Sequence, residues 1–406
     1  MSNDKPIKKN KALQELNKLS TEQELQKEQV IIPELEAEAN NLTLAPTSKG
    51  FTYTLTAMAN AKYPDAYVKS RAKISGQKEE LKIMQPADPS KRQLYFRHIR
   101  EKATDGIDKI DLIFNKDPFE GIARSKEQTI KLFLFIINEL IRNSNIREGS
   151  IPQQISFVSN NLVEAGYYST TNSASKAIQA ALPNLTGMTY SISKSATSKD
   201  KKVAVGEFNF VPIKEWEVLE DVKPKLYTVF FGDRDNRDAW DMLFGSFTCI
   251  PTYTGALGSN SILATFTIFE RARQIASEDK IKEDAEEYSF TVSLQLLNER
   301  IGLGDYDNRN AKAKNLDPII KAYSELLNKE LEVYKGNPSD IDIKLIVDDR
   351  QNAKRQIENG KIKVTLRGKY LNYFKGFLKN KKIKIAKNRS KRYLNSKNKS
   401  QGKSKQ

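Results

Sequence analysis

The chain has 406 residues, 38% hydrophobic and 29% charged, with a formal net charge of +16 at pH 7. It is too long for one ordinary core, so we expect about two to three domains, and its longest apolar run, Leu132 to Ile137, is far too short to span a membrane. One cysteine, Cys249, and one histidine, His98, exclude an internal disulfide and disfavour thiolate metal sites and histidine-based catalysis.

The positive charge is concentrated at the C-terminus. Residues 359–406 contain 17 Lys and Arg and no Asp or Glu, which leaves 50 basic and 51 acidic residues in 1–358. Clustered cations gain free energy by displacing counterions from phosphate, so the composition predicts a polyanionic partner. No signal peptide or anchor is recognisable at the N-terminus, and we expect a cytoplasmic protein with no membrane partner.

The first 120 residues give weak signals. Residues 1–50 are rich in Lys, Glu, Gln and Asn and predict a disordered arm with one helix from Thr21, ending in a linker over residues 42–48. Residues 51–120 contain enough aromatic and aliphatic residues for a folded region, but no lasting periodicity. The basic and aromatic run 91–100 resembles a phosphate-contacting segment, although a solvated amphipathic helix explains it more simply.

Residues 121–222 predict a first winged helix-turn-helix domain. A buried helix is expected from Ser125, then a short helix that carries Ile155 and ends at Gly166. A third helix, capped by Asn172 or Ser173, has Ala174, Ala177, Ile178, Ala181 and Leu182 at helical spacing and ends at Pro183. Alternation then predicts a hairpin over residues 188–210 with a basic tip at 195–202 and a bulge near Gly206, which would be the wing.

Residues 223–372 repeat this pattern. A helix begins at Ser259, residues 292–297 lead to Gly302, and a helix with Pro318 at its first position opens at Asp317. Its predicted buried side is Ile320, Tyr323, Leu327, Leu331 and Tyr334. A hairpin of residues 341–347 and 362–366 closes the copy, and a basic, disordered tail occupies 373–406. The fold class is therefore α+β with two tandem winged helices, and two unrelated α+β domains remain the alternative.

The predicted DNA contacts are polar and basic side chains on the third helix and the wing of each copy. An exposed helix without carboxylates suits base edges and phosphates. In the first copy these residues are Asn172, Ser173, Ser175, Lys176, Gln179, Lys199, Lys201 and Lys202. In the second copy and the tail they are Arg309, Asn310, Lys312, Lys314, Lys321, Lys354, Arg355, Lys381, Lys382, Arg389, Lys391 and Arg392. Glu325 and Asp317 weaken base reading by the second helix, where we expect phosphate contacts to dominate.

We predict no enzymatic activity, no cofactor and no metal. The cluster Asp233, Asp235, Asp238 and Asp241 fails the calcium-loop pattern, because Arg237 and Asp238 stand at its fifth and sixth positions. A metal-dependent DNA-processing enzyme built on this cluster is the alternative from another class.

The order of elements over about residues 125–370 resembles the plasmid replication initiators with tandem winged-helix domains. The resemblance implies binding of double-stranded DNA at repeated origin sequences, host replication initiation proteins as partners, a homodimer, and a bacterial, nucleoid- or plasmid-associated location. It also implies that the first unit dimerises and the second reads bases, whereas the residues favour the first helix as the base reader; both assignments stay open. A transcriptional or partition regulator is the alternative within DNA-binding proteins, and the sequence leaves RNA open as a partner.

Overall fold

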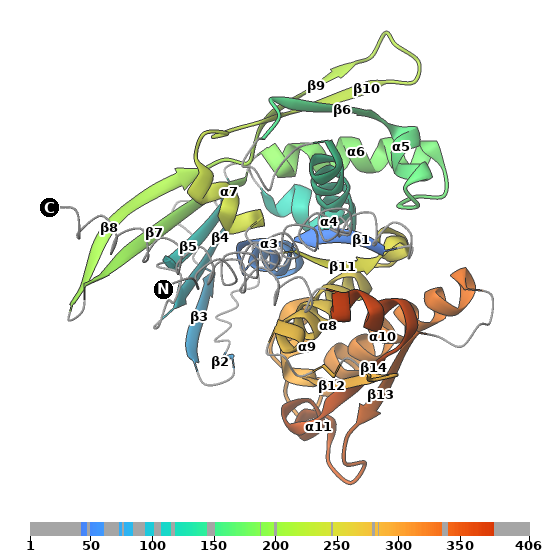
Figure 1. The fold of residues 1–406 in the computed structure, drawn as a ribbon. Coiled ribbons are helices and arrows are strands. Elements are labelled where there is room, and N and C mark those ends of the chain that lie inside the picture. The colour runs from blue at the N-terminus through green and yellow to red at the C-terminus, as the bar shows by residue number, and fades with distance from the viewer. Residues whose placement is uncertain are drawn as a thin grey trace, which may run out of the picture.

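A computed structural model describes residues 42–46, 49–60, 73–74, 77–83, 94–100, 107–114, 118–143, 151–186, 188–198, 201–244, 247–277, 281–282, 284–334 and 340–376. The fold is α+β with open antiparallel sheets, which confirms the predicted class (Figure 1). None of the helices in these ranges combines the length and the hydrophobicity of a membrane span. The predicted helix at Thr21, Lys199 and the tail lysines and arginines from Lys381 to Arg392 lie outside the described residues.

The first unit consists of three helices and a three-stranded sheet with strand order β6-β10-β9. Its elements are α4 (Pro118–Asn143), β6 (Gln154–Val158), α5 (Ser159–Glu164), α6 (Thr171–Thr186), β9 (Ile213–Leu219) and β10 (Leu226–Phe231). The inner face of the sheet buries Phe157, Tyr227 and Val229 toward the helices, and α4 packs along α6. Apolar burial on one face of each element therefore holds the unit together.

The second unit has the same order of elements apart from two insertions. Strands Met188–Ser198 and Lys201–Phe210 follow α6 in the first unit, and helix Ala353–Asn359 separates the last two strands of the second unit. The elements of the second unit are α8 (Ser259–Ser277), β12 (Tyr288–Ser293), α9 (Leu294–Ile301), α10 (Asp317–Val333), β13 (Ile341–Ile346) and β14 (Lys361–Leu366). Its sheet order, β12-β14-β13, again places the first strand beside the third. The internal repeat expected from the sequence is thus present in connectivity and in strand order.

The residues that gave the weakest sequence signal contribute most of a six-stranded sheet. Its order is β2-β3-β4-β5-β7-β8, made of β2 (Lys73–Ile74), β3 (Gln77–Ile83), β4 (Leu94–Arg100), β5 (Ile107–Phe114), β7 (Met188–Ser198) and β8 (Lys201–Phe210). The predicted amphipathic helix over 91–100 is therefore wrong, because Leu94–Arg100 pairs with β3 and β5 on its two edges.

The predicted hairpin over 188–210 exists, with a register shift opposite Lys194 and Ser195, but it does not join the first unit's small sheet. β7 pairs with β5, whereas β6 pairs with β10. The hairpin that extends the first unit's sheet is β9 and β10, which pair from Leu226 and Leu219 onward. The predicted boundary at 222/223 lies in the turn between these paired strands.

Two elements near the N-terminus join the two units. β1 (Leu42–Pro46), predicted as part of a linker, is a strand paired with β11 (Phe247–Pro251), because Leu42 and Ala45 are buried there. α3 (Lys49–Asn60) lies between α4 and α8 (Figure 1). The ring of Phe51 packs 5.7 Å from that of Phe133 in α4 and 5.7 Å from that of Phe266 in α8.

Several predicted element ends are corrected by the structure. α4 begins at Pro118 instead of Ser125, and Ile155 lies in a strand instead of a helix. α6 continues through Pro183 to Thr186, although the proline removes the hydrogen bond to the carbonyl of Gln179 and crowds that carbonyl. Leu331 is 47% exposed, because the buried face of α10 instead carries Ile319, Ala322, Tyr323 and Leu326.

Candidate nucleic-acid interface

A tight turn positions α6. Gly166 adopts a positive φ of 77°, and the backbone N–H of Tyr167 donates to the carbonyl of Leu162 over 2.9 Å. Thr170 then caps the helix, because its hydroxyl oxygen accepts from the backbone N–H of Ser173. The five small and aliphatic residues predicted for the buried face of α6 are all buried. The opposite face of α6 is therefore left to solvent.

Three of the five predicted residues on α6 form one exposed stripe. Asn172, Lys176 and Gln179 are exposed and follow the i, i+4, i+7 spacing of a single helical face. Within the described residues, no carboxylate pairs with Lys176. The stripe can thus offer amide groups to base edges and an ammonium group to a phosphate.

The other two predicted residues on α6 have structural hydrogen bonds. The Ser173 hydroxyl donates to the carbonyl of Thr170 over 2.8 Å. The Ser175 hydroxyl lies 3.1 Å from the hydroxyl of Tyr227 on β10, so it ties the helix to the sheet. Both side chains are only partly exposed, so the structure places neither of them in the exposed stripe.

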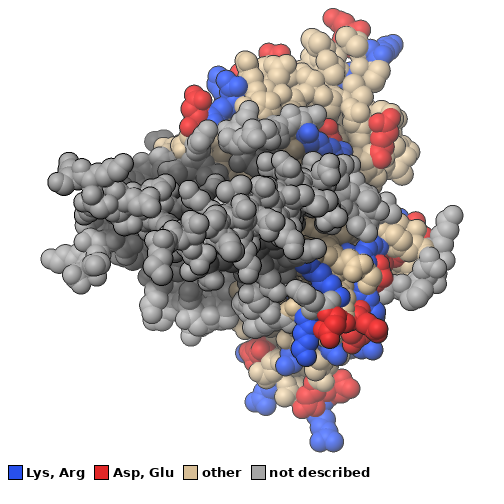
Figure 2. Space-filling view, viewed as in Figure 1, with Lys and Arg blue, Asp and Glu red and all other residues tan. Residues whose placement is uncertain are grey.

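The turn between β9 and β10 carries lysines, whereas the sequence predicts the basic hairpin tip of the first unit at residues 195–202. Lys223 and Lys225 lie in this turn, and Lys225 pairs with Glu220 over 2.9 Å. Charged side chains gather at the top of Figure 2, where Figure 1 places this hairpin end. Lys201 and Lys202, the predicted wing residues, lie instead in β8, at the end of the six-stranded sheet. A longer alternation signal over 188–210 obscured the shorter hairpin that follows it.

In the second unit, helical structure begins before Asp317, where the sequence predicts the start of the helix. Asp307 accepts from the backbone N–H of Asn310, and the Asn310 amide oxygen accepts from the N–H of Asp307, which closes a reciprocal cap. The π-helical turn η4 (Lys312–Leu316) then runs into α10. Asn310 is therefore a capping residue, and its side-chain oxygen is not free to read a base.

The predicted cations of this segment are exposed. Arg309, Lys312, Lys314 and Lys321 all face solvent, and Asn328 continues the line of Lys314 and Lys321 at intervals of seven residues. Within the described residues none of these cations has a carboxylate partner. Asp317 is also exposed on this side, so the stripe of the second unit keeps one acidic group.

Glu325 was expected to point outward, and the structure corrects this. Its carboxylate accepts from the backbone N–H of Gly258 over 2.9 Å and from the hydroxyl of Ser261. Both donors belong to the N-terminus of α8, where the helix dipole favours an anion. The carboxylate is thus engaged with α8 and adds little negative charge to the exposed stripe of α10.

Buried amides fix the turn between α9 and η4. Asn315 donates to the Asn298 side-chain oxygen over 2.7 Å, and both donate to the carbonyl of Gly304. Gly302 ends α9 with a φ of 75°. Lys354 and Arg355 lie in α11 (Ala353–Asn359), a helix and not the predicted wing loop, because Asn352 caps it through the N–H of Arg355.

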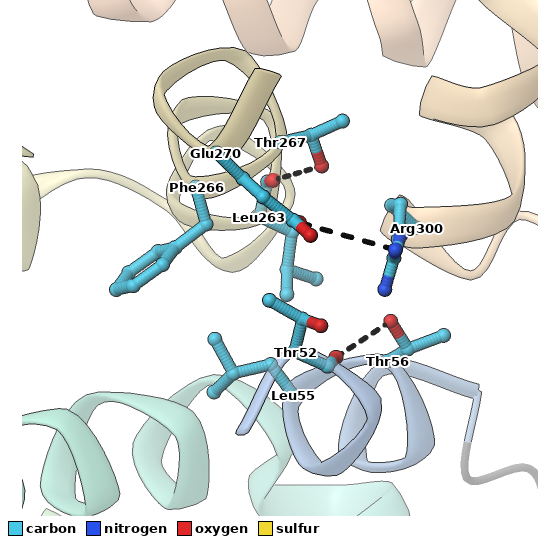
Figure 3. A pocket seen from close by; sticks show the side chains of 8 residues that line it. All are labelled: Thr52, Leu55, Thr56, Leu263, Phe266, Thr267, Glu270 and Arg300. Carbon is cyan, nitrogen blue, oxygen red and sulfur yellow. Dashed lines mark hydrogen bonds and ion pairs between the residues drawn. The ribbon is translucent and has the colours of Figure 1, made fainter. Parts of the chain in front are cut away.

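A small cavity and Asp233, the first member of the aspartate cluster, both lie among the described residues. A cavity of about 10 Å³ lies between α3, α8 and α9 and is bounded by Thr52, Leu55, Glu270 and Arg300 (Figure 3). This volume suits about one water molecule. Asp233 has a positive φ of 45° and accepts from the backbone N–H of Val211, which is a structural use of its carboxylate.

The solved structures that are similar to this chain include three crystal structures. The crystal structure of the Pi initiator protein in complex with iteron DNA is 12% identical, with a TM-score of 0.39, and the match covers 59% of this chain and 90% of that one. Two crystal structures of domains 2 and 3 of RctB are 9% identical, with a TM-score of 0.37, over 78% of this chain and 98% of each. No protein-family model and no curated sequence matches the chain.

Proposed function

We propose that this protein binds double-stranded DNA in a sequence-directed manner through two winged-helix units, and that it acts as a replication initiator at repeated origin sequences. In each unit a helix pair precedes two antiparallel strands, and the second of these strands pairs with the strand before the helix pair. In the first unit β7 and β8 are inserted after the helix pair. This is the order of elements in a winged helix-turn-helix. The initiator role is what the sequence resemblance implies.

The observation that carries the proposal is the exposed face of the second helix of each pair. α6 presents Asn172, Lys176 and Gln179, and α10 presents Lys321 and Asn328 after Lys314. Side-chain amides can make paired hydrogen bonds with adenine, and ammonium groups contact phosphate or guanine. The opposite faces are buried against α4 and α8, so both helices have fixed positions from which to enter a groove.

The exposed side chains of α6 and α10 suit different roles in DNA binding. The α6 stripe has two amides and one lysine, which suits base reading, whereas the stripe of α10 is richer in lysine and suits phosphate contacts. Because Phe51 contacts both α4 and α8, the spacing of α6 and α10 is set by packing. We therefore propose that the chain reads an extended site with a fixed distance between its two halves.

The test is selection of bound sequences from a random duplex pool by the full chain at two salt concentrations. The proposal expects enrichment of one extended sequence, and enrichment of none would overturn sequence-directed binding. The initiator role is tested by placing the enriched sequence in repeats beside this gene on a plasmid without another origin. The plasmid should replicate only with both parts present.

We also propose that the chain acts without catalysing a reaction. Asp233 supports this proposal, because its carboxylate holds the backbone of Val211 and its backbone oxygen accepts from the Trp240 indole. Supercoiled DNA incubated with the chain and magnesium should remain intact. Cleavage that disappears in Asp235→Ala would establish the nuclease alternative instead.

A further inference from the structure

The outer face of the second unit's sheet carries an arrangement of lysines that the recognition helices do not explain. Lys363 on β14 is the register partner of Lys344 on β13, and both side chains are exposed. Lys361 lies two residues before Lys363 and points to the same side. We call Lys344, Lys361 and Lys363 the lysine face.

Like charges directly opposite each other on antiparallel strands are destabilising. Lys344 has Asp342 at 3.3 Å as a partner, but within the described residues Lys361 and Lys363 have no carboxylate partner. The central strand β14 therefore presents the ammonium groups of Lys361 and Lys363 without a carboxylate partner among the described residues, next to the ammonium group of Lys344. A bound anion would remove this repulsion.

The first unit offers an internal comparison, because its sheet has the same strand order. There the middle cross-strand row is Ser156, Thr228 and Glu217, whereas in the second unit the corresponding row is Thr291, Lys363 and Lys344. Lys363 and Lys344 thus stand where the first unit has the neutral Thr228 and the acidic Glu217. The fold itself does not require cations at these positions.

The lysine face is separate from the stripe on α10. The inner face of the sheet buries Ile343, Ile362 and Val364 against the helices, so the outer face points away from them. A duplex seated along Lys314 and Lys321 therefore cannot place the same phosphates on Lys363. The lysine face would need a different segment of the partner.

The chemistry of the lysine face favours a duplex backbone over other polyanions. The outer-face residues around the lysines include Ser289, Thr291, Ser293 and the exposed Ile346, which is the register partner of Lys361. Within these described strands, the outer face offers no aromatic side chain on which an unstacked base could lie. Hydroxyl and ammonium groups are donors to phosphate oxygens. Asp342 at one end and Asp348 at the other limit the basic surface to its middle, and charges of both signs are visible over this unit (Figure 2).

We propose that the lysine face binds the phosphate backbone of a duplex segment other than the one held by α6 and α10. This inference rests on the proposed function, since it assigns a second segment to a chain that already binds DNA. Binding would be independent of base sequence and would weaken with salt.

The experiment uses the full chain with a photoactivatable crosslinker on a single introduced cysteine, either Thr291→Cys or Ser156→Cys. These positions are equivalent in the two sheets, and the natural Cys249 is buried. An unlabelled duplex with the enriched sequence first saturates the recognition helices. A labelled duplex of unrelated sequence is then added and crosslinked.

We expect the labelled duplex to crosslink several-fold more at Thr291→Cys than at Ser156→Cys. Adding Lys361→Gln and Lys363→Gln should remove this excess, whereas Lys214→Gln with Lys282→Gln, which also removes two exposed cations, should leave it. Equal crosslinking at the two positions, or no effect of the first pair, would overturn the inference. Crosslinks to a second copy of the chain instead would identify a protein partner and also overturn it.

The two proposals fail separately. If the unlabelled duplex does not bind, the proposed function is lost whatever the labelled duplex does. If it binds and the labelled duplex shows no preference for Thr291→Cys, only the lysine face is lost.

Discussion

The Glu325 carboxylate on α10 accepts a 2.9 Å hydrogen bond from the backbone N–H of Gly258 at the start of α8. A single side chain therefore links the candidate recognition helix of the second unit to the first helix of that unit.

Replacing Glu325 should weaken the second unit. Glu325→Ala leaves the α8 N-terminus without its acceptor, and we expect a loss of about 1–2 kcal/mol in the free energy of unfolding. Urea unfolding measures this loss. Glu332→Ala removes an exposed partner of Lys329 and should change the free energy by less than about 0.5 kcal/mol. Equal effects of the two variants would contradict the capping role.

Residues of the α6 stripe should separate affinity from specificity. Gln179→Ala should relax preference at one base position by about 1–3 kcal/mol, because an amide reads base edges. Lys176→Ala should weaken binding to all sequences alike and lower the salt slope by about one. Titrations of enriched and scrambled duplexes measure both effects, with Lys214→Ala as a control outside the stripe. A uniform loss in Gln179→Ala would argue against base reading.

Phe51 should couple the two units. Phe51→Ala removes a buried ring between α4 and α8, and we expect a loss of about 3–5 kcal/mol in stability. Binding to the extended site should fall more than binding to either half of it. Thermal unfolding and titrations with full and half sites measure these effects. If binding to full and half sites falls equally, Phe51 does not set the spacing of the units.

The buried carboxylate of Glu330 should be essential to folding of the second unit. It pairs with Lys369 over 2.7 Å and accepts from the hydroxyls of Tyr253 and Tyr370. Glu330→Ala leaves the largely buried Lys369 unpaired, which costs about 3–5 kcal/mol. Glu358→Ala, which removes an exposed partner of Lys354, is the matched control for urea unfolding. A small loss in both variants would show that Lys369 finds water or another partner.

Alkaline pH should unfold the protein through its buried tyrosines. Burial raises the pKa of Tyr167, Tyr190, Tyr253 and Tyr370 above the ordinary value of 10.0. The unfolded chain therefore releases these protons at lower pH than the folded chain, so stability is full below pH 10 and falls above it. Tyrosinate absorbance should rise together with loss of circular dichroism. Titration of all tyrosines near pH 10 with the fold intact would contradict this.

Helical spacing made much of the first and second units predictable. Ala174 to Leu182, Ile262 to Ala272 and Gly302 all stand where the spacing of apolar residues and the helix-ending glycine place them. The exposed residues Asn172, Lys176 and Gln179 followed from the same spacing. Side chains with internal partners, such as Ser175 and Asn310, could not be separated from them, because the partners are distant or belong to a cap.

Pairing between distant segments was not predictable. The apolar spacing of Phe51, Leu55 and Met58 is helical, but the threonines between them hide it, and its partners Phe133 and Phe266 lie far along the chain. Alternation of apolar and polar residues over 188–210 predicts two strands there, so the sequence predicts the wing at these residues. Alternation does not indicate which strands pair. The pairing partner of β6 decides which hairpin, β7–β8 or β9–β10, extends the sheet of the first unit, and the sequence does not reveal that partner.

The pairing of β1 with β11 also limits the order in which parts of the fold can form during synthesis. Leu42 leaves the ribosome long before its partner Pro251, which follows about two hundred residues later. At about 5–20 residues per second, this strand waits roughly ten seconds or more without its partner. β1 can therefore pair with β11 only after the whole first unit has been synthesised.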